Sequence, residues 1–326
     1  MRIDRATITN FRGIRSLPEL SFDKINIVLG VNTSGKTSLL LALSMLNAAF
    51  ISESIGVKKI SDLPLHSPQG VFNAISYGDV FRRVMSSSKA LVHALGDVST
   101  IKYYVGQKTI SVRISKMGTI EVADRENILK EFRYGDILLF LPIEDLINGY
   151  LSLMSTNAFW ERLQKEKLYV ELADIVSKLM PIRITEIIPP IYVDGRSVLG
   201  VRIEEDGVFY LPITDLSTST KKVLTLLTLY RIFEPKVLIV DDIDAFLDTP
   251  TLKGLVEYLI SRNNQVILAT HSLDTIVGVY ESKIKDVQVV VLSKVDGSIN
   301  VKTLPIEEAM EHIEAGIDIR IVPPGD

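Results

Sequence analysis

The sequence predicts an α/β fold in which helices cover a mixed, mainly parallel sheet. Three observations indicate this class. Helix and strand patterns alternate over the last third of the chain, a glycine-rich turn joins an early apolar strand to a helix, and a later apolar strand ends in two aspartates. The chain has 326 residues, of which 47% are hydrophobic and 23% charged, so it can bury a large core and is not expected to be disordered.

The N-terminal region is expected to contain strands and a buried helix. Apolar residues alternate with polar ones up to Phe11, and an uninterrupted apolar run ends at Gly30. The helix that follows is apolar nearly all round, which predicts burial. The strands are expected at 3–11, 20–22 and 25–29, and the helix at 38–50.

The middle of the chain changes from strand spacing to helical spacing. Ile, Val and Tyr alternate with polar residues over 101–122, which predicts a small antiparallel β lobe. Helical spacing then holds over 143–180 and ends at Pro181. We therefore expect a helical insertion at residues 136–181, whose Trp160 is interpreted as a core residue in preference to a stacking platform. The main domain would be discontinuous, formed by residues 1–135 and 182–326.

Consecutive strands are expected over 182–211, and helices and strands then alternate from residue 218 on, as in sheets with helical crossovers. Strands are expected at 182–188, 191–193, 198–203, 208–211, 236–240, 265–269 and 287–292. Helices are expected at 218–232 and 250–261.

Residues 30–37 fit the phosphate-loop pattern G-x-x-x-x-G-K-[ST]. The loop reads Gly30-Val31-Asn32-Thr33-Ser34-Gly35-Lys36-Thr37 and leads into Ser38. Its glycines let the backbone wrap a phosphate, and successive amides with the helix N-terminus supply positive dipoles. Lys36 is expected to face solvent and reach the β- and γ-phosphates of ATP, while Thr37 binds Mg²⁺. The plainer alternative is a glycine-rich turn before a core helix.

Two further apolar strands are expected to carry polar side chains to the same sheet edge. Asp241 and Asp242 follow the strand at 236–240, and His271 follows the strand at 265–269. Ligands of α/β sheets bind at the carboxyl ends of parallel strands. Asp241 is the expected Mg²⁺ ligand and Asp242 the general base for the attacking water. His271 is expected to contact the γ-phosphate or that water.

These motifs, in this order, resemble those of ABC-class ATPase heads in the RecF, SMC and OLD-like branch. Asn10-Phe11-Arg12-Gly13 is similar to the N-terminal strand of that branch, and Asn32 matches its G-x-N-x-x-G-K-[ST] loop. Residues 237–248 resemble the Walker B motif and D-loop, and residues 270–272 the histidine switch. Leu216-Ser217-Thr218-Ser219 lies where the family carries its signature motif. The resemblance covers about 1–50 and 205–326.

The resemblance implies a P-loop ATPase head that binds ATP and Mg²⁺ and pairs head to tail with a second copy. ATP would contact the loop residues 30–38, together with Ser217 and Ser219 of the partner head. Arg12 would contact the base or ribose, or would have a structural role instead. Lys36, Asp242 and His271 would act in hydrolysis. In the family, such cycles act on DNA or on a partner protein, in genome maintenance or defence.

Two positions depart from the family pattern. Ser219 replaces the glycine of L-S-x-G, and Asp242 stands where most relatives have glutamate. Both favour an alternative function, a slow or non-hydrolysing nucleotide-gated module that regulates an effector. A small-molecule kinase is disfavoured because it would leave the signature-like and histidine-switch segments unused. Gln69 and Gln107 are candidates for the family's Q-loop residue, and each can equally be a turn residue.

The segments and charged clusters of the sequence limit which partners can be expected. It has no heptad repeats, and too few residues follow His271 for an appended nuclease domain, so a nuclease is expected to be a separate chain. Arginine and lysine clusters are candidates for a DNA groove, although charged pairs are usually solvated faces. These clusters are Arg2, Arg5, Arg12 and Arg15 near the start, Arg82-Arg83, and Lys221-Lys222.

Composition also sets the expected compartment. The net charge of −4 argues against a wholly basic nucleic-acid coat, and the absence of cysteine excludes disulfides and thiolate metal sites. The longest charge-free apolar stretch, 37–52, is shorter than the roughly 20 residues of a membrane-spanning helix. The N-terminus has no signal-peptide pattern. A cytoplasmic protein without membrane contact is expected.

Overall fold

The computed structural model describes residues 1–55, 98–115, 119–123, 136–140, 151, 154–155, 157–193, 195–295 and 298–321. One large sheet contains β1 (Arg5–Phe11), β2 (Ile14–Ser21), β3 (Ile25–Leu29), β4 (Val98–Val105), β5 (Lys108–Ser115), β6 (Ile120–Ala123), β7 (Ile137–Phe140), β11 (Val237–Val240), β12 (Gln265–Thr270), β13 (Val287–Val295) and β14 (Ser298–Pro305). A separate small sheet contains β8 (Ile184–Val193), β9 (Arg196–Glu204) and β10 (Val208–Pro212). The helices include α1 (Lys36–Ile55), α6 (Asn157–Lys165), α7 (Leu168–Leu179), α8 (Thr218–Phe233), α9 (Thr249–Ile260), α10 (Leu273–Glu281) and α11 (Ile306–Glu314).

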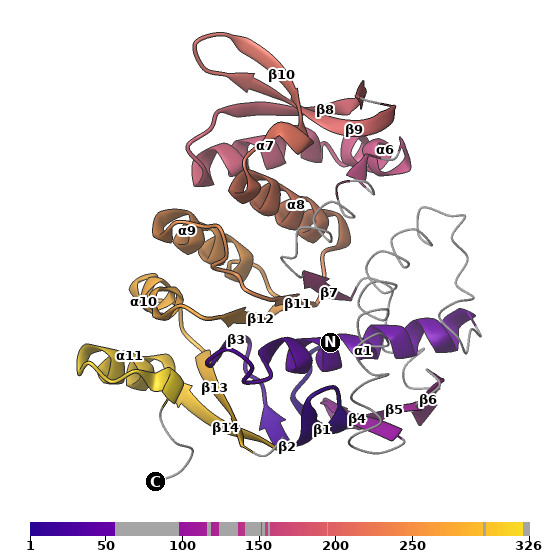
Figure 1. The fold of residues 1–326 in the computed structure, drawn as a ribbon. Helices are drawn as coiled ribbons and strands as arrows, with labels where there is room; N and C mark the ends of the chain where they lie inside the picture. Colours follow the sequence, from indigo (N-terminus) through magenta and orange to yellow (C-terminus); the bar gives the residue numbers. More distant parts are fainter. Residues whose placement is uncertain are drawn as a thin grey trace.

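The large sheet is mixed. Its order is β6-β5-β4-β1-β2-β14-β13-β3-β12-β11-β7 (Figure 1). Neighbours from β13 to β7 run parallel, while β6 to β2 and the β13–β14 pair run antiparallel. The predicted α/β fold with a mixed sheet is therefore confirmed.

The parallel block holds the core. Every residue of β3, β11 and β12 is buried, which explains why these strands read as continuous apolar runs. The helix α1 packs against strands of both the parallel and the antiparallel blocks, including β1, β5, β11 and β12. Its all-round apolar sequence follows from this position.

Helix α7 links the small sheet to the rest of the molecule. It packs against β8 on one side and against α8 and α9 on the other. Figure 1 shows the small sheet at the top of the molecule, beyond α7 and α8. Trp160 on α6 is partly buried against the core, with its ring centroid 5.9 Å from that of Tyr169, so its interpretation as a packing residue is confirmed.

Some expectations about the elements were wrong. Residues 137–140 were expected to begin the helical insertion, but they form β7, which pairs with β11 at the edge of the large sheet. The antiparallel strands expected over 101–122 are present as β4, β5 and β6, and β4 joins them to the large sheet by pairing with β1. Two strands were expected at 182–188 and 191–193, but residues 184–193 form one strand. Its Pro189 and Pro190 are tolerated because β8 is an edge strand. The elements β14, α10 and α11 were not expected.

Within the described residues, no helix combines the length and apolar character needed to cross a membrane.

Candidate nucleotide site

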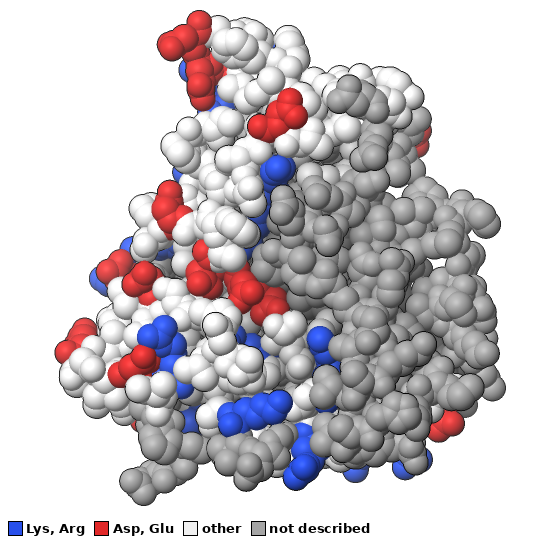
Figure 2. Space-filling view, in the orientation of Figure 1, with Lys and Arg blue, Asp and Glu red and all other residues white. Residues whose placement is uncertain are grey.

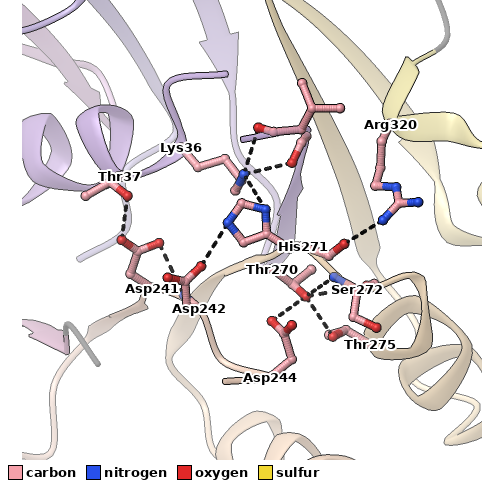
Figure 3. Close-up of polar contacts among 12 residues, drawn as sticks. Lys36, Thr37, Asp241, Asp242, Asp244, Thr270, His271, Ser272, Thr275 and Arg320 are labelled. Atoms are coloured by element: carbon pink, nitrogen blue, oxygen red, sulfur yellow. Dashed lines mark hydrogen bonds and ion pairs between the residues drawn. The ribbon is translucent and has the colours of Figure 1, made fainter. Parts of the chain in front are cut away.

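The candidate site lies where β3, β11 and β12 end. The three strands are parallel neighbours in register, so the loops that follow Leu29, Val240 and Thr270 meet at one sheet edge. Figure 3 shows Lys36, Thr37, Asp241, Asp242 and His271 converging from these loops. The side chains that the sequence predicted to meet at one sheet edge do lie close together in the structure.

Steric limits explain both glycines of the phosphate loop. A Cβ on Gly30 would lie 2.5 Å from the carbonyl oxygen of Leu292 and 2.5 Å from the hydroxyl of Ser34. Gly35 has a φ of 102°, which other residues rarely adopt, and a Cβ there would collide with Ile299. Asn32 and Thr33 are exposed at the tip of the loop, and Ser38 is half-buried in the first turn of α1.

The Ser34 hydroxyl fits a phosphate ligand. The Ser34 residue is 2% exposed, and its Oγ has no hydrogen-bond partner among the described residues. A buried polar atom without a partner costs free energy, so the loop gains from any ligand that bonds to it.

Lys36 was expected to face solvent, and this was wrong: the residue is only 5% exposed. Its Nζ donates to the carbonyl oxygens of Gly30 at 2.7 Å and Val31 at 3.2 Å, and to Nδ1 of His271 at 3.2 Å. The ammonium is thus folded back into the loop. Burial lowers the pKa of Lys36, and the carboxylates of the Asp241 loop oppose that change.

Thr37 and Asp241 form the metal-binding candidate. Thr37 Oγ1 donates to Asp241 Oδ2 at 2.7 Å, and the backbone amide of Asp242 donates to Asp241 Oδ1 at 3.2 Å. Burial raises the pKa of Asp241, while the Thr37 hydrogen bond counteracts this. A hydroxyl and a carboxylate side by side are the hard oxygen donors that Mg²⁺ prefers, so these residues fit the ion.

His271 connects Lys36 to Asp242. Its Nε2 lies 3.2 Å from Asp242 Oδ1, on the opposite side of the ring from the Lys36 contact. Because the Lys36 ammonium can only donate, Nδ1 accepts, and the proton of a neutral ring sits on Nε2 facing Asp242. The backbone oxygen of His271 accepts a hydrogen bond from Arg320 at 3.0 Å.

Two family profiles cover this constellation. The AAA ATPase domain family matches residues 1–187, more than half of the chain. The chain belongs to the AAA ATPase domain family. A second match, over residues 108–277, is to the family described as "AAA domain, putative AbiEii toxin, Type IV TA system".

Solved structures show which proteins share the fold of this AAA ATPase domain. An SMC head bound to the C-winged helix domain of ScpA is 16% identical, with a TM-score of 0.58, covering 95% of this chain and 100% of the other. A Pyrococcus furiosus SMC head with an extended coiled coil is 15% identical, with a TM-score of 0.56, covering 96% and 98%. A search of curated proteins finds no match. The domain thus shares its fold with these SMC heads.

The signature-like residues of the AAA ATPase domain lie away from its phosphate loop. Ser217 caps α8, accepting a hydrogen bond from the Thr220 amide at 3.2 Å, and its hydroxyl lies 2.9 Å from that of Ser219. Both serines line a cavity of about 380 Å³ together with Phe246 and Asp248. No phosphate-loop residue lines that cavity.

Arg12 lies at the same sheet edge as the phosphate loop. It occupies the turn between β1 and β2, where a Cβ on Gly13 would lie 2.9 Å from Nζ of Lys294. Lys294 pairs with Ile299, the residue that packs against Gly35. Gln107 instead occupies the β4–β5 turn beside the start of β1, at the opposite edge, so it is not a Q-loop residue. Gln69 lies outside the described residues.

The basic clusters are less available for DNA than expected. Arg2 pairs with Asp4 and Asp23, and Arg5 pairs with Glu19 at 2.6 Å. Arg15 is exposed, whereas Arg82 and Arg83 lie outside the described residues. Figure 2 shows acidic side chains near the middle of the visible face and Lys and Arg mostly below them.

Lys222 was the residue most clearly misinterpreted. It was expected on a basic surface, yet it is 0% exposed. Burial lowers its pKa to about 8, against the attraction of Asp244, Asp242 and Asp241. Its helical spacing with Leu226 and Leu229 was the available signal, since that stripe faces the core.

Proposed function

We propose that this AAA ATPase domain binds Mg-ATP at the phosphate loop and hydrolyses it. The observation that supports this best is the continuous array at one sheet edge, in which Thr37 meets Asp241 while Lys36, His271 and Asp242 follow one another. A glycine-rich turn with a purely structural role would not need five polar side chains to converge there.

Each residue has a distinct role in the proposal. Lys36 moves from the Gly30 and Val31 carbonyls to the β- and γ-phosphates, and the Ser34 hydroxyl gains its missing partner. Thr37 and Asp241 hold Mg²⁺, which neutralises phosphate charge next to the acidic loop. Asp242 accepts the proton of the attacking water, and His271 orients that water or the γ-phosphate. Arg12 is the proposed contact to the ribose or base.

We further propose that two copies pair head to tail on ATP. Ser217 and Ser219 of one copy would then cap the γ-phosphate held by the other, because a helix N-terminus favours an anion. The cycle would act on DNA or on a partner protein, in genome maintenance or defence, with a nuclease or other effector as a separate chain. One similar SMC head is bound to a winged-helix domain, which supports a protein partner as one of these possibilities.

The magnesium assignment predicts a shift in metal dependence. Asp241→Asn keeps the shape of the side chain but removes its charge, so the Mg²⁺ concentration for half-maximal ATP binding should rise roughly 10-fold or more. A calorimetric titration at several Mg²⁺ concentrations measures this, and EDTA should abolish tight binding by the unchanged chain. Asp286→Asn, at an exposed position on another loop, is the matched control. Equal metal dependence of both variants would remove Asp241 from the metal site.

The general-base assignment predicts a loss of turnover with retained binding. Asp242→Asn cannot accept a proton, so phosphate release should fall by roughly 10² while ATP binding survives. The ATP-bound pair should accumulate, which light scattering would detect as a doubled mass. Unchanged turnover would move the base elsewhere, with His271 as the next candidate.

The alternative function is a slow, nucleotide-gated binding module. It is favoured by the engagement of Asp242 with His271 and by the hydroxymethyl of Ser219 at the N-terminus of α8. Turnover of the unchanged chain, measured with and without duplex DNA, separates the two functions. A rate that remains near zero in both conditions while ATP still induces pairing would favour the module.

A further inference from the structure

Lys222 holds the loop that carries Asp242. Its Nζ donates to three backbone oxygens, those of Asp242 at 2.8 Å, Ile243 at 2.9 Å and Ala245 at 2.9 Å. A lysine ammonium has three protons, so each proton has a partner within the loop. No carboxylate of the described residues lies within ion-pair distance of Nζ. The polar contacts of this side chain are therefore with the backbone of the loop.

The loop needs such an anchor because its backbone is strained. Asp242 has a φ of 44° and Phe246 a φ of 66°, and neither is a glycine. Each residue in this left-handed region costs about 1–3 kcal/mol unless its surroundings impose the conformation. The carbonyls that Lys222 binds belong to Asp242 and to residues between Asp242 and Phe246. These hydrogen bonds therefore favour the backbone conformation in which the Asp242 carboxylate points at His271.

Other contacts fix the far side of the loop. The Ile243 amide donates to the Ala269 oxygen at 3.0 Å, and the Asp244 carboxylate accepts from Thr270 Oγ1 at 2.6 Å. These contacts come from β12, the strand that also delivers His271. Among the described residues, Lys222 provides the contact from α8. It thus ties the loop to the helix whose N-terminal end carries Ser217 and Ser219.

We propose that Lys222 is a positioning residue that sets the direction of Asp242 and couples it to the signature end of α8. The inference rests on the proposed function, in which that end of α8 meets the nucleotide of a second copy. A displacement of α8 caused by the partner's γ-phosphate would be carried through Lys222 to the carboxylate of the first copy's own site. Each composite site would then respond to the state of the other.

The test compares Lys222→Met with Lys221→Met. Methionine fills a similar volume without donors, and the neighbouring Lys221, whose Nζ contacts the Thr214 oxygen, provides a control for the loss of one positive charge on the same helix. Lys222→Met should bind ATP within about twofold of the unchanged chain, because the phosphate loop is intact. Its turnover should fall by roughly 10- to 100-fold, as expected when a reacting group is misplaced by about 1 Å. Lys222→Gln retains an NH₂ donor, so its turnover should lie between that of Lys222→Met and that of Lys221→Met.

Hydrogen exchange gives a readout that does not depend on hydrolysis. The amides of Ile243, Ala245 and Leu247 are hydrogen-bonded within the loop or to β12, and they should exchange faster in Lys222→Met, while amides of β12 keep their protection. If the unchanged chain binds ATP without turnover, the hydrolysis proposal fails, and this measurement still decides the role of Lys222. Unchanged exchange in the loop, or turnover equal to that of Lys221→Met, would overturn the proposal.

Mixing experiments assign the effect to one half of the paired site. Lys222→Met mixed with Ser219→Glu should regain activity, since one composite site has an intact loop from one chain and an intact signature end from the other. Lys222→Met mixed with Asp242→Asn should stay inactive, because each chain then spoils its own catalytic loop. If the first mixture stays inactive and the second regains activity, Lys222 acts at the signature end and does not position Asp242.

Discussion

Lys36→Ala should lose measurable Mg-ATP binding. The residue supplies the only lysine ammonium directed into the described phosphate loop, where it donates to the Gly30 and Val31 oxygens, and it also contacts His271. A charge-assisted hydrogen bond to phosphate is about twice as strong as a neutral one. The alanine substitution removes two or more such bonds together. Calorimetry or a fluorescent ATP analogue measures the loss.

The buried position of Lys36 requires a folding control for this variant. Its alanine form leaves the Gly30 and Val31 carbonyls without their partner, so circular dichroism and thermal unfolding should accompany the binding measurement. Lys285→Ala, at an exposed position, corrects for the loss of one charge. A folded Lys36→Ala chain that binds ATP normally would refute the phosphate-loop assignment.

Ser219→Glu should abolish ATP-dependent pairing and the hydrolysis that depends on it. Ser219 lies in the first turn of α8, where a negative side chain favours the helix dipole, so the variant should fold and still bind ATP as a monomer. In the paired state its carboxylate would face the partner's triphosphate, and like charges at short range cost several kcal/mol. Light scattering with ATP, alongside phosphate release, measures both effects.

A mixture of Ser219→Glu and Lys36→Ala tests whether the site is shared between chains. Their heterodimer has one composite site with Lys36 from one chain and Ser219 from the other, and a second site that carries both lesions. Partial recovery of activity is expected. Chains that associate and remain inert would contradict a composite site, and a Ser219→Glu chain as active as the unchanged one would remove the signature assignment.

The parts of the site that could be predicted from sequence are those built by local rules. A glycine-rich loop between an apolar strand and a helix has few structural solutions, and strands that end in aspartate or histidine deliver these side chains to one edge if they are parallel. The sequence therefore predicted that five residues would meet at one sheet edge, and the structure brings these together: Lys36, Thr37, Asp241, Asp242 and His271. Their partners follow from the strand register.

The parts that could not be predicted depend on pairing between distant segments. Residues 137–140 carry no signal that they join β11, because a short apolar stretch fits either an edge strand or a helix. Lys222 looked like half of a basic pair because its environment is created by a loop about 20 residues away. The orientation of Lys36 depends on His271, far along the chain.

The position of β3 has a consequence for how the protein is made. This strand carries the phosphate loop, yet its two neighbours in the sheet are β12 and β13, near the other end of the chain. During synthesis, Ile25–Leu29 leaves the ribosome long before either neighbour exists, and an unpaired apolar strand is prone to aggregate. The nascent chain therefore has to shield this segment until residues beyond 287 emerge. In a refolding experiment, the capacity to bind ATP should appear last and mark the closing of the sheet.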